Sequence, residues 1–374
     1  MLKRDYIQPT YRLNAKIIQV DWPLCGLLLI LMSMGLCILY SASNQNMAMI
    51  ARQSVRLLLA LIVMLGFAFI PPNKYKTWAP HVFFIGFGLL IAVMFMGRIG
   101  KGAQRWLDIG LFRFQPSEIM KIAVPLMSAW YLDKKPLPLR LNHIFVTALI
   151  IFIPAIMIAK QPDLGTALMV MFAGLSGVFL AGISLRFIMG VFLSLAAIAP
   201  LIWHSMHGYQ KQRILTLLNP EQDPLGTGYH IIQSKIAIGS GGLLGKGWLA
   251  GTQSHLNFLP EHATDFIFAV SGEEFGLLGS SLLIIIISLI ALRSLHIAKH
   301  AQTTFTRLLG TSLAMSFFFS AFVNIGMVMG ILPVVGVPLP LVSYGGTAMV
   351  TFLAGFGILM SISTHKILFN HVNG

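Results

Sequence analysis

The sequence is poor in charge, and poorest in acidic residues. Of its 374 residues only 10% are Asp, Glu, Lys or Arg, whereas a soluble domain carries about 25%. Apolar residues make up 56% of the chain. This balance excludes an ordinary soluble globule and a disordered chain, and it requires a lipid bilayer as solvent. Cysteine is almost absent: Cys25 and Cys37 lie in one apolar run, about 18 Å apart along a helix, which excludes a disulfide between them.

Long apolar runs are what the sequence has instead. A membrane-spanning helix needs about 20 apolar residues, and we identify ten candidate spans. They cover residues 22–41, 53–70, 78–96, 119–132, 143–159, 164–185, 187–203, 266–292, 308–331 and 341–362. We therefore predict an all-α integral membrane protein with a single transmembrane domain (1–374), a polytopic bundle of about ten transmembrane helices. One large loop, 204–264, separates the seventh span from the eighth.

Positive charge is in excess, because 26 Lys and Arg stand against 12 Asp and Glu, for a formal net charge of +14. In a chain of apolar spans this excess indicates topology and contact with membrane lipids rather than nucleic-acid binding. Lys and Arg are more frequent in the short segments on the side of the two termini. The positive-inside rule then predicts a cytoplasmic N-terminus (1–21), a cytoplasmic C-terminus and an extracytoplasmic loop 204–264.

A second group of cations works against this topology. Basic residues gather at the outer edge of the spans: Arg52, Arg56, Arg98, Lys101, Arg105, Arg113, Lys121 and Lys160. One interpretation is an anionic ligand that binds from the outer side. The other is that these long side chains reach the lipid headgroups. The residue pattern alone does not choose between the two.

Acidic residues are few enough to be considered one by one. Several lie at or inside predicted spans: Glu118, Asp163, Asp265, Glu273 and Glu274. Ionisable groups there are costly and mark functional candidates. Glu273 and Glu274 fall on different faces of one helix, so the burial of both requires partners, and we expect packing or gating groups. Asp21 and Asp133, at inner ends of spans, are expected to serve topology.

Two pairs of opposite charge have close spacing. Glu118 and Lys121 are three residues apart and share a helix face, so we expect them to pair at the bilayer edge. The pair either forms the wall of a polar substrate cavity or tolerates burial without a further role. Lys160 and Asp163 lie in a tight outer turn and could also pair, although an acid there could equally complement a helix N-terminus.

Asp265 opens the eighth span at the outer face. An acid in the first turn of a helix complements the helix dipole, which is a sufficient structural reason for its presence. The functional alternative is a general base, next to the large loop and on the side of the outer cations. The histidines offer no convincing metal site, because no set of them has ligand spacing.

Two outer segments have distinctive patterns. Residues 229–238 predict a short amphipathic helix on the membrane surface, and the glycine cluster that follows predicts a compact turn. Residues 331–341 contain three prolines, so they cannot form a regular helix. Residues 343–347 then expose backbone N–H groups near a helix start, which is a candidate seat for an anion.

Several motifs of the chain resemble those of the SEDS family (shape, elongation, division and sporulation). The most specific runs from Asn324 to Gly346 and contains PVVGVPLP and SYGG. The others are KGAQRW (101–106), FQPSE (114–118), QPDLGT (161–166), GYHIIQS (228–234) and TDFIFA (264–269). They follow one another in the family's order. Within the family, the chain is most similar to the members that elongate rod-shaped cells.

The resemblance implies a peptidoglycan glycosyltransferase of the bacterial inner membrane, with ten spans and an active site that faces the periplasm. Its substrate would be lipid II, a disaccharide-pentapeptide on undecaprenyl pyrophosphate. Its partner would be a class B penicillin-binding protein, which cross-links the glycan strand. Asp265 matches the family's catalytic aspartate, Glu118 and Lys121 match a salt bridge in the central cavity, and Arg52 matches a shorter motif.

The resemblance also leads to a hypothesis for the mechanism. Asp265 takes the proton of the acceptor 4-hydroxyl, which attacks the anomeric carbon of the donor sugar in one inverting displacement. The candidates for stabilising the leaving pyrophosphate are Arg52, Arg105, Lys121 and Lys160. A divalent cation, Mg²⁺ or Mn²⁺, could share this task, although the sequence identifies no certain cofactor. Other residues expected at the substrate or the cavity are Asp163, Gln233, Ser343 and Tyr344.

Two other functions fit the same composition. A lipid II flippase would also need a cationic cavity but no general base, so Asp265→Asn would leave it largely active. A non-catalytic scaffold for the cross-linking partner would tolerate any change in the cavity. The polymerase is the function that we predict.

Overall fold

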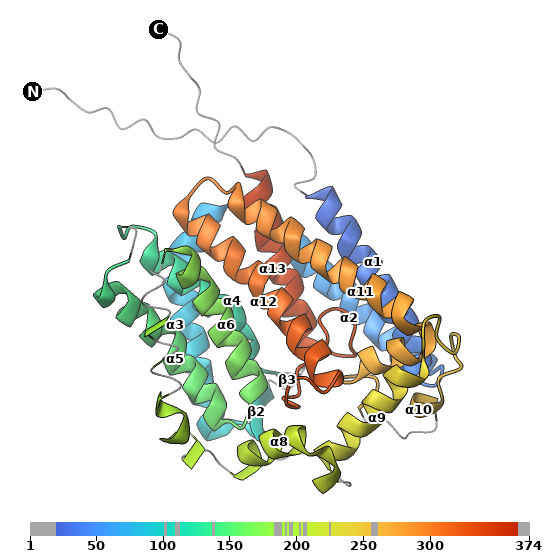
Figure 1. Cartoon of the computed structure of the whole chain (residues 1–374). Helices are drawn as coiled ribbons and strands as arrows, with labels where there is room; N and C mark the ends of the chain where they lie inside the picture. Colours follow the sequence, from blue (N-terminus) through green and yellow to red (C-terminus); the bar gives the residue numbers. More distant parts are fainter. Residues whose placement is uncertain are drawn as a thin grey trace, which may run out of the picture.

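Long helices form a bundle in which helices joined by a short connection run in opposite directions (Figure 1). The computed structural model describes residues 20–100, 103–108, 113–136, 139–182, 189–190, 193, 197–201, 203–204, 208–223, 226–255 and 261–365. The long helices are α1 (Trp22–Ala42), α2 (Met47–Phe69), α3 (Pro72–Met96), α4 (Pro116–Leu132), α5 (Leu141–Lys160), α6 (Leu164–Leu180), α11 (Ile267–Lys299), α12 (Thr304–Val328) and α13 (Thr347–Thr364).

Short helices gather at one end of the bundle, at the bottom of Figure 1. They are α8 (Gly208–Leu218), η1 (Pro220–Gln222), α9 (Thr227–Ser240) and α10 (Thr252–His255). We name this end the Asp265 end, because Asp265 directly precedes α11 there. We name the opposite end the Asp133 end, after the residue that follows α4.

The expected all-α membrane bundle is confirmed. Seven of the described helices are long and apolar enough to cross a membrane, and α6 is a shorter apolar helix. α1 begins and α13 ends at the Asp133 end, which fits the expectation of termini on one side. Of the predicted seventh span, 187–203, the structure describes residues 189–190, 193, 197–201 and 203, and the other positions lie outside the described residues. α6 ends at the Asp133 end, and α8 lies at the Asp265 end.

Side-chain caps determine where several helices begin. Asp21, Asn46, Asp163 and Thr303 each accept a hydrogen bond from a backbone N–H in the first turn of α1, α2, α6 and α12, respectively. Such caps satisfy N–H groups that have no partner within the helix. The Asn46 cap explains why α2 begins at Met47 rather than at the predicted residue 53.

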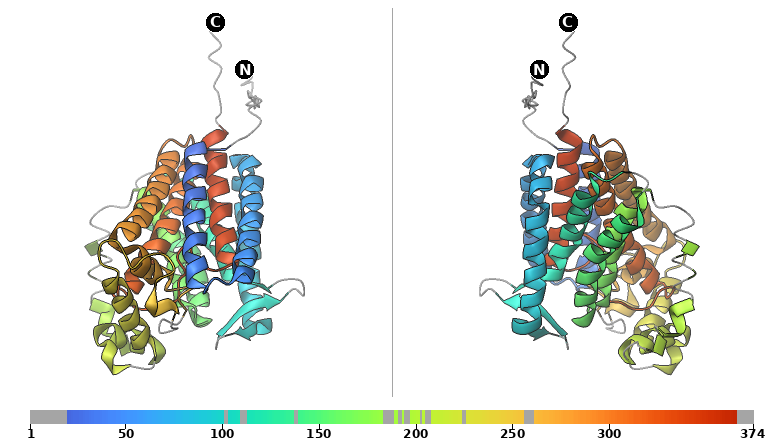
Figure 2. Two further views of the ribbon diagram at one scale, coloured as in Figure 1. Left: turned by 90° about the vertical axis from the view of Figure 1, so that its right-hand side faces the viewer. Right: turned by 90° about the vertical axis from the view of Figure 1, so that its left-hand side faces the viewer.

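A small antiparallel sheet, which the sequence pattern did not predict, joins α3 to α4. Its strands are β1 (Arg98–Gly100), β2 (Ala103–Asp108) and β3 (Arg113–Phe114), in the order β1-β2-β3. The sheet lies at the Asp265 end, beside α3 (Figure 2). The strands are short and lack a regular alternation of apolar and polar residues, so they give little periodic signal.

α11 is interrupted at Gly276, whose φ of 63° and ψ of −157° are not helical. The compact glycine turn predicted after α9, residues 241–247, packs against this break. The backbone N–H of Lys246 donates to the carbonyl oxygen of Glu273 over 3.0 Å. A Cβ on Gly276 would lie 2.4 Å from the backbone nitrogen of Gly245. Glycine is therefore required here both by the positive φ and by the close approach of the turn.

The short helix predicted for residues 229–238 is present as α9, and one of its faces packs against the bundle. Ile231 and Ser234 are buried, and the Ser234 hydroxyl donates to the carbonyl oxygen of Val328, at the end of α12, over 2.9 Å. The His230 ring stacks on Phe266, with ring centroids 5.5 Å apart. The helix is thus fixed to both α11 and α12.

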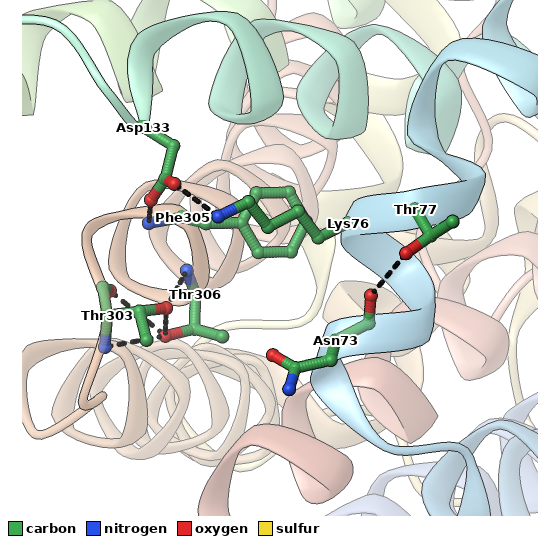
Figure 3. Close-up of polar contacts among 7 residues, drawn as sticks. All are labelled: Asn73, Lys76, Thr77, Asp133, Thr303, Phe305 and Thr306. Carbon is green, nitrogen blue, oxygen red and sulfur yellow. Dashed lines mark hydrogen bonds and ion pairs between the residues drawn. The ribbon is translucent and has the colours of Figure 1, made fainter. Parts of the chain in front are cut away.

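Acidic residues at the Asp133 end fasten helices to one another. Asp133 lies 2.5 Å from the Lys76 Nζ of α3 and accepts a hydrogen bond of 2.8 Å from the backbone N–H of Phe305 in α12 (Figure 3). Asp21 caps α1 and lies 2.7 Å from a guanidinium nitrogen of Arg293 in α11. Both acids therefore do more than the purely topological role expected for them.

Candidate active site

Asp265 lies in a short non-helical stretch before α11. The cap of α11 is Phe266, so Asp265 precedes the helix rather than occupying its first turn. Its side chain is half-buried. A Cβ on Gly336 would lie 3.6 Å from the Asp265 Oδ2, which places the carboxylate against the segment 331–346. That segment is non-helical, as its three prolines predict.

The segment 331–346 is bound to the backbone around Asp265. The Ser343 hydroxyl donates to the carbonyl oxygen of Thr264 over 2.6 Å. The backbone N–H of Tyr344 donates to the carbonyl oxygen of Ala263 over 2.9 Å. The structure therefore brings together three residues that the sequence predicted for the site: Asp265, Ser343 and Tyr344.

A large groove of about 1670 Å³ lies between α2, α3, α4 and α13. Its lining is charged near the Asp265 end, where it contains Arg56, Arg105, Asp108 and Glu118. Further along, the lining is mainly apolar and includes Val63, Phe67, Tyr75, Val82, Leu126 and Ile358. The α2 lining residues run from Arg56 to Phe67, a rise of about 17 Å, whereas the hydrocarbon core of a bilayer is about 30 Å thick. The groove thus has the polarity of a lipid with a charged head and a long tail.

Glu118 and Lys121 form the ion pair that their spacing predicts. Lys121 Nζ lies 2.7 Å from Glu118 Oε1, and both residues are only 5% exposed. Lys121 also lies over the ring of Phe352, 5.6 Å from its centroid. Glu118 lines the groove, and its Oε2 is buried without a hydrogen bond from any residue that the structure describes. A buried acceptor of this kind favours a donor from outside the chain, such as a ligand or water.

Arg56 lines the groove and also contacts the segment 331–346, against which Asp265 lies. Its guanidinium lies over the ring of Tyr344, 4.8 Å from the centroid. Gly346 and Thr347, at the start of α13, line the groove beside it. The first N–H groups of α13 have no side-chain cap, so the candidate anion seat of the sequence analysis opens toward the groove. Arg56 was counted among the outer cations but not chosen for the site, although it precedes Leu59 and Val63 at helical spacing on the lining face of α2.

Arg105 and Asp163 are held in place by neighbouring turns. Arg105 Nε donates to the carbonyl oxygen of Gln161 over 3.2 Å, and a terminal guanidinium nitrogen donates to that of Pro162. Asp163 Oδ2 accepts a hydrogen bond of 2.8 Å from Gln115 Nε2, while Oδ1 caps α6. The structure thus gives Asp163 these partners in place of the ion pair with Lys160 that the sequence suggested.

Three other predicted site residues stand apart from the groove lining. Arg52 is exposed on α2, and Lys160 is exposed at the end of α5. Gln233 is half-buried on α9. Their roles toward substrate stay predictions.

Glu273 and Glu274 are both buried, and each accepts a hydrogen bond from another part of the chain. Glu273 Oε1 lies 2.7 Å from Lys246 Nζ and accepts a hydrogen bond of 2.8 Å from the backbone N–H of Thr252. Glu274 accepts a hydrogen bond from the Ser41 hydroxyl of α1. The two acids fix the large loop and α1 to the first part of α11.

The residues offer no evident resident metal site. Within the described ranges, no group of three or more His, Cys, Asp and Glu side chains could hold an ion. Glu118, which lines the groove together with Asp108, pairs with Lys121, and Asp163 accepts a hydrogen bond from Gln115. Mg²⁺ or Mn²⁺ therefore stays a prediction of the sequence analysis.

Comparison with known proteins identifies the family. Residues 15–367 match the FtsW/RodA/SpoVE family, described as "Cell cycle protein". The chain belongs to this family. It is 52% identical to the peptidoglycan glycosyltransferase MrdB of Escherichia coli K12 over 93% of this chain and 95% of that one. It is 36% identical to the probable peptidoglycan glycosyltransferase FtsW of Trichlorobacter lovleyi, over 93% and 94% of the two chains.

Solved structures agree with this assignment. A peptidoglycan synthase complex, described as coordinating polymerization and crosslinking, superposes with a TM-score of 0.81 at 32% identity, over 92% of this chain and 97% of that one. The rod shape determining protein RodA of Thermus thermophilus superposes with a TM-score of 0.70 at 28% identity, over 92% and 96%. These relatives confirm the expected family, its elongation branch and the enzyme class of a glycosyltransferase.

Proposed function

We propose that this member of the FtsW/RodA/SpoVE family polymerises lipid II into the glycan strands of peptidoglycan for cell elongation, with Asp265 as the general base. One observation carries the proposal. The charged mouth of a long apolar groove adjoins the segment 331–346 through the contact of Arg56 with Tyr344, and the Asp265 carboxylate lies against the same segment. A polyprenyl pyrophosphate has this sequence of chemistry: a long apolar chain, then two phosphates, then the sugar that reacts.

The donor substrate would lie with its tail in the apolar part of the groove and its pyrophosphate at the mouth. Arg56 and Arg105 supply positive charge there. The uncapped start of α13 supplies backbone N–H groups and the positive end of a helix dipole. Lys121 would add less, because Glu118 already neutralises it. These groups favour the leaving of pyrophosphate, because they stabilise the charge that develops on it.

The reaction would be a single displacement. The 4-hydroxyl oxygen of the acceptor sugar forms a bond to the anomeric carbon of the donor sugar as the bond from that carbon to the pyrophosphate oxygen breaks. The proton of the hydroxyl passes to the Asp265 carboxylate, and undecaprenyl pyrophosphate leaves. One displacement inverts the α-linked donor into a β-linked strand, so one base is sufficient. No step is assigned to a metal ion; Mg²⁺ or Mn²⁺ would act as an additional partner of the pyrophosphate.

The orientation and the partner belong to the same proposal. We place both termini and the Asp133 end at the cytoplasm and the Asp265 end, with the large loop 204–264, at the periplasm. This places the site where lipid II reaches the outer leaflet. The partner would be a class B penicillin-binding protein, which cross-links each strand as it forms; the described synthase complex supports this pairing.

Polymerisation by purified protein tests the proposal. Wild type and Asp265→Asn are compared with labelled lipid II, with and without a class B penicillin-binding protein, and the glycan products are separated on a gel. We expect polymer from wild type and a loss of about 100- to 10,000-fold in Asp265→Asn, the range of general base catalysis. Equal polymer from both would reject Asp265 as the base. No polymer from folded wild type with its partner, together with lipid II transfer across vesicles, would favour a flippase instead.

A further inference from the structure

The peptide of Asp265 is held by a side chain from another helix. Asn324 lies on α12 and is fully buried. Its Nδ2 donates to the carbonyl oxygen of Asp265 over 2.8 Å and to the carbonyl oxygen of Val337 over 2.7 Å. One amide group therefore joins the backbone of Asp265 to the segment 331–346, against which the carboxylate lies.

Ser343 makes a second connection from that segment. Its hydroxyl donates to the carbonyl oxygen of Thr264 and accepts a hydrogen bond of 2.8 Å from the backbone N–H of Leu339. A hydroxyl has one hydrogen to donate, and here it is committed within the chain. Ser343 is also 4% exposed. Both features favour a role in holding the backbone over direct contact with substrate.

The same segment is tied to the wall of the groove. Gln53 on α2 is buried, and its Nε2 donates to the carbonyl oxygen of Ser343 over 3.2 Å. It lies about one helical turn before Arg56. The residues that hold Asp265 are thus connected to the helix that would bind the pyrophosphate.

We infer that Asn324 and Ser343 are positioning residues, which fix the Asp265 carboxylate relative to the groove mouth. Asp265 precedes α11, so the helix does not determine its orientation. A general base must lie within about 2.6–3.2 Å of the hydroxyl it deprotonates, and a displacement of about 1 Å can cost about 100-fold in rate. The inference rests on the proposed function, in which Asp265 is that base.

Steady-state kinetics of the purified complex test this inference. We expect Asn324→Ala and Ser343→Ala to lower kcat by about 10- to 100-fold while KM for lipid II stays within about twofold, because the groove lining is unchanged. Ser320→Ala is the matched control, since Ser320 is buried on α12 about one turn before Asn324. We expect it to retain the wild-type kcat.

Each outcome decides the inference. Wild-type kcat in folded Asn324→Ala and Ser343→Ala would overturn it, even if both variants unfold at lower temperature. A raised KM with unchanged kcat would also overturn it, because it would indicate substrate contact. If Asn324→Ala does not fold, Ser343→Ala decides alone. Absence of polymer from the wild-type complex would instead reject the proposed function, so the two failures are distinguishable.

Discussion

The two ends of the bundle use the same kinds of charged residue in different ways. At the Asp133 end, Asp133 is satisfied by Lys76 and by the N-terminus of α12, and Asp21 by Arg293. At the Asp265 end, Arg56 and Arg105 line an open groove. The paired charges at the Asp133 end hold helices together, whereas the two arginines that line the groove are available to bind an anion.

The difference shows why a count of cations by side describes only part of this protein. The positive-inside rule accounts for charges near the termini, but it does not explain basic residues at the opposite end. Two of those residues, Arg56 and Arg105, line the charged mouth of an apolar groove. The Glu118–Lys121 pair shows both features, because the two charges neutralise each other and Glu118 also lines the groove.

The largest effect is expected from breaking the Glu118–Lys121 pair. Lys121→Met leaves the buried Glu118 carboxylate without its counter-ion, which should lower the free energy of unfolding by about 3–5 kcal/mol. The double variant Glu118→Gln/Lys121→Met should recover most of that stability, because it removes both charges. Thermal unfolding of the protein in lipid nanodiscs measures both. Equal stability of Lys121→Met and wild type would show that Glu118 and Lys121 do not form the buried ion pair seen in the structure.

A smaller effect is expected at the groove mouth. Arg56→Ala should raise KM for lipid II by about 10- to 100-fold, because a charge-assisted contact with phosphate contributes about 1.5–3 kcal/mol. Arg56→Lys should have a KM between those of wild type and Arg56→Ala, because lysine keeps the charge but lacks the planar guanidinium group. The measurement is the rate of glycan polymerisation against lipid II concentration.

Arg52→Ala serves as the comparison for Arg56→Ala, because sequence motifs favoured Arg52 and the structure places Arg56 in the groove. We expect the smaller rise in KM for Arg52→Ala. A larger rise for Arg52→Ala than for Arg56→Ala would reverse this assignment and move the anion site out of the groove.

The smallest effect is expected at the Asp133 end. Asp133→Ala removes the partner of Lys76 and of the Phe305 N–H, so the free energy of unfolding should fall by about 1–2 kcal/mol. The kcat of the folded enzyme should not change, because this end is remote from Asp265. Lys134→Ala is the control: its side chain is exposed next to Asp133, and surface changes of this kind alter stability by about 0.5 kcal/mol or less. Loss of kcat in folded Asp133→Ala would contradict the division between the two ends.

Local sequence patterns predicted what depends on neighbours in the chain. Apolar length predicted the helices, because a bilayer requires every backbone polar group to be paired within the segment. The spacing of Glu118 and Lys121 predicted their contact, because residues three apart share a helix face. The prolines predicted the irregular segment 331–341, because proline cannot continue a helix.

The sequence by itself therefore determined the membrane bundle and the irregular segment 331–341, and it singled out Asp265 as a candidate base. The tertiary structure alone decided which arginine faces the groove, how Asn324 and Ser343 hold Asp265, and that Asp133 caps α12. It also decided the small sheet between α3 and α4. The physical reason is the distance along the chain: Asn324 and Asp265, or Asp133 and Phe305, meet only after the helices pack. No local pattern carries such contacts, because they depend on which faces of distant helices come together.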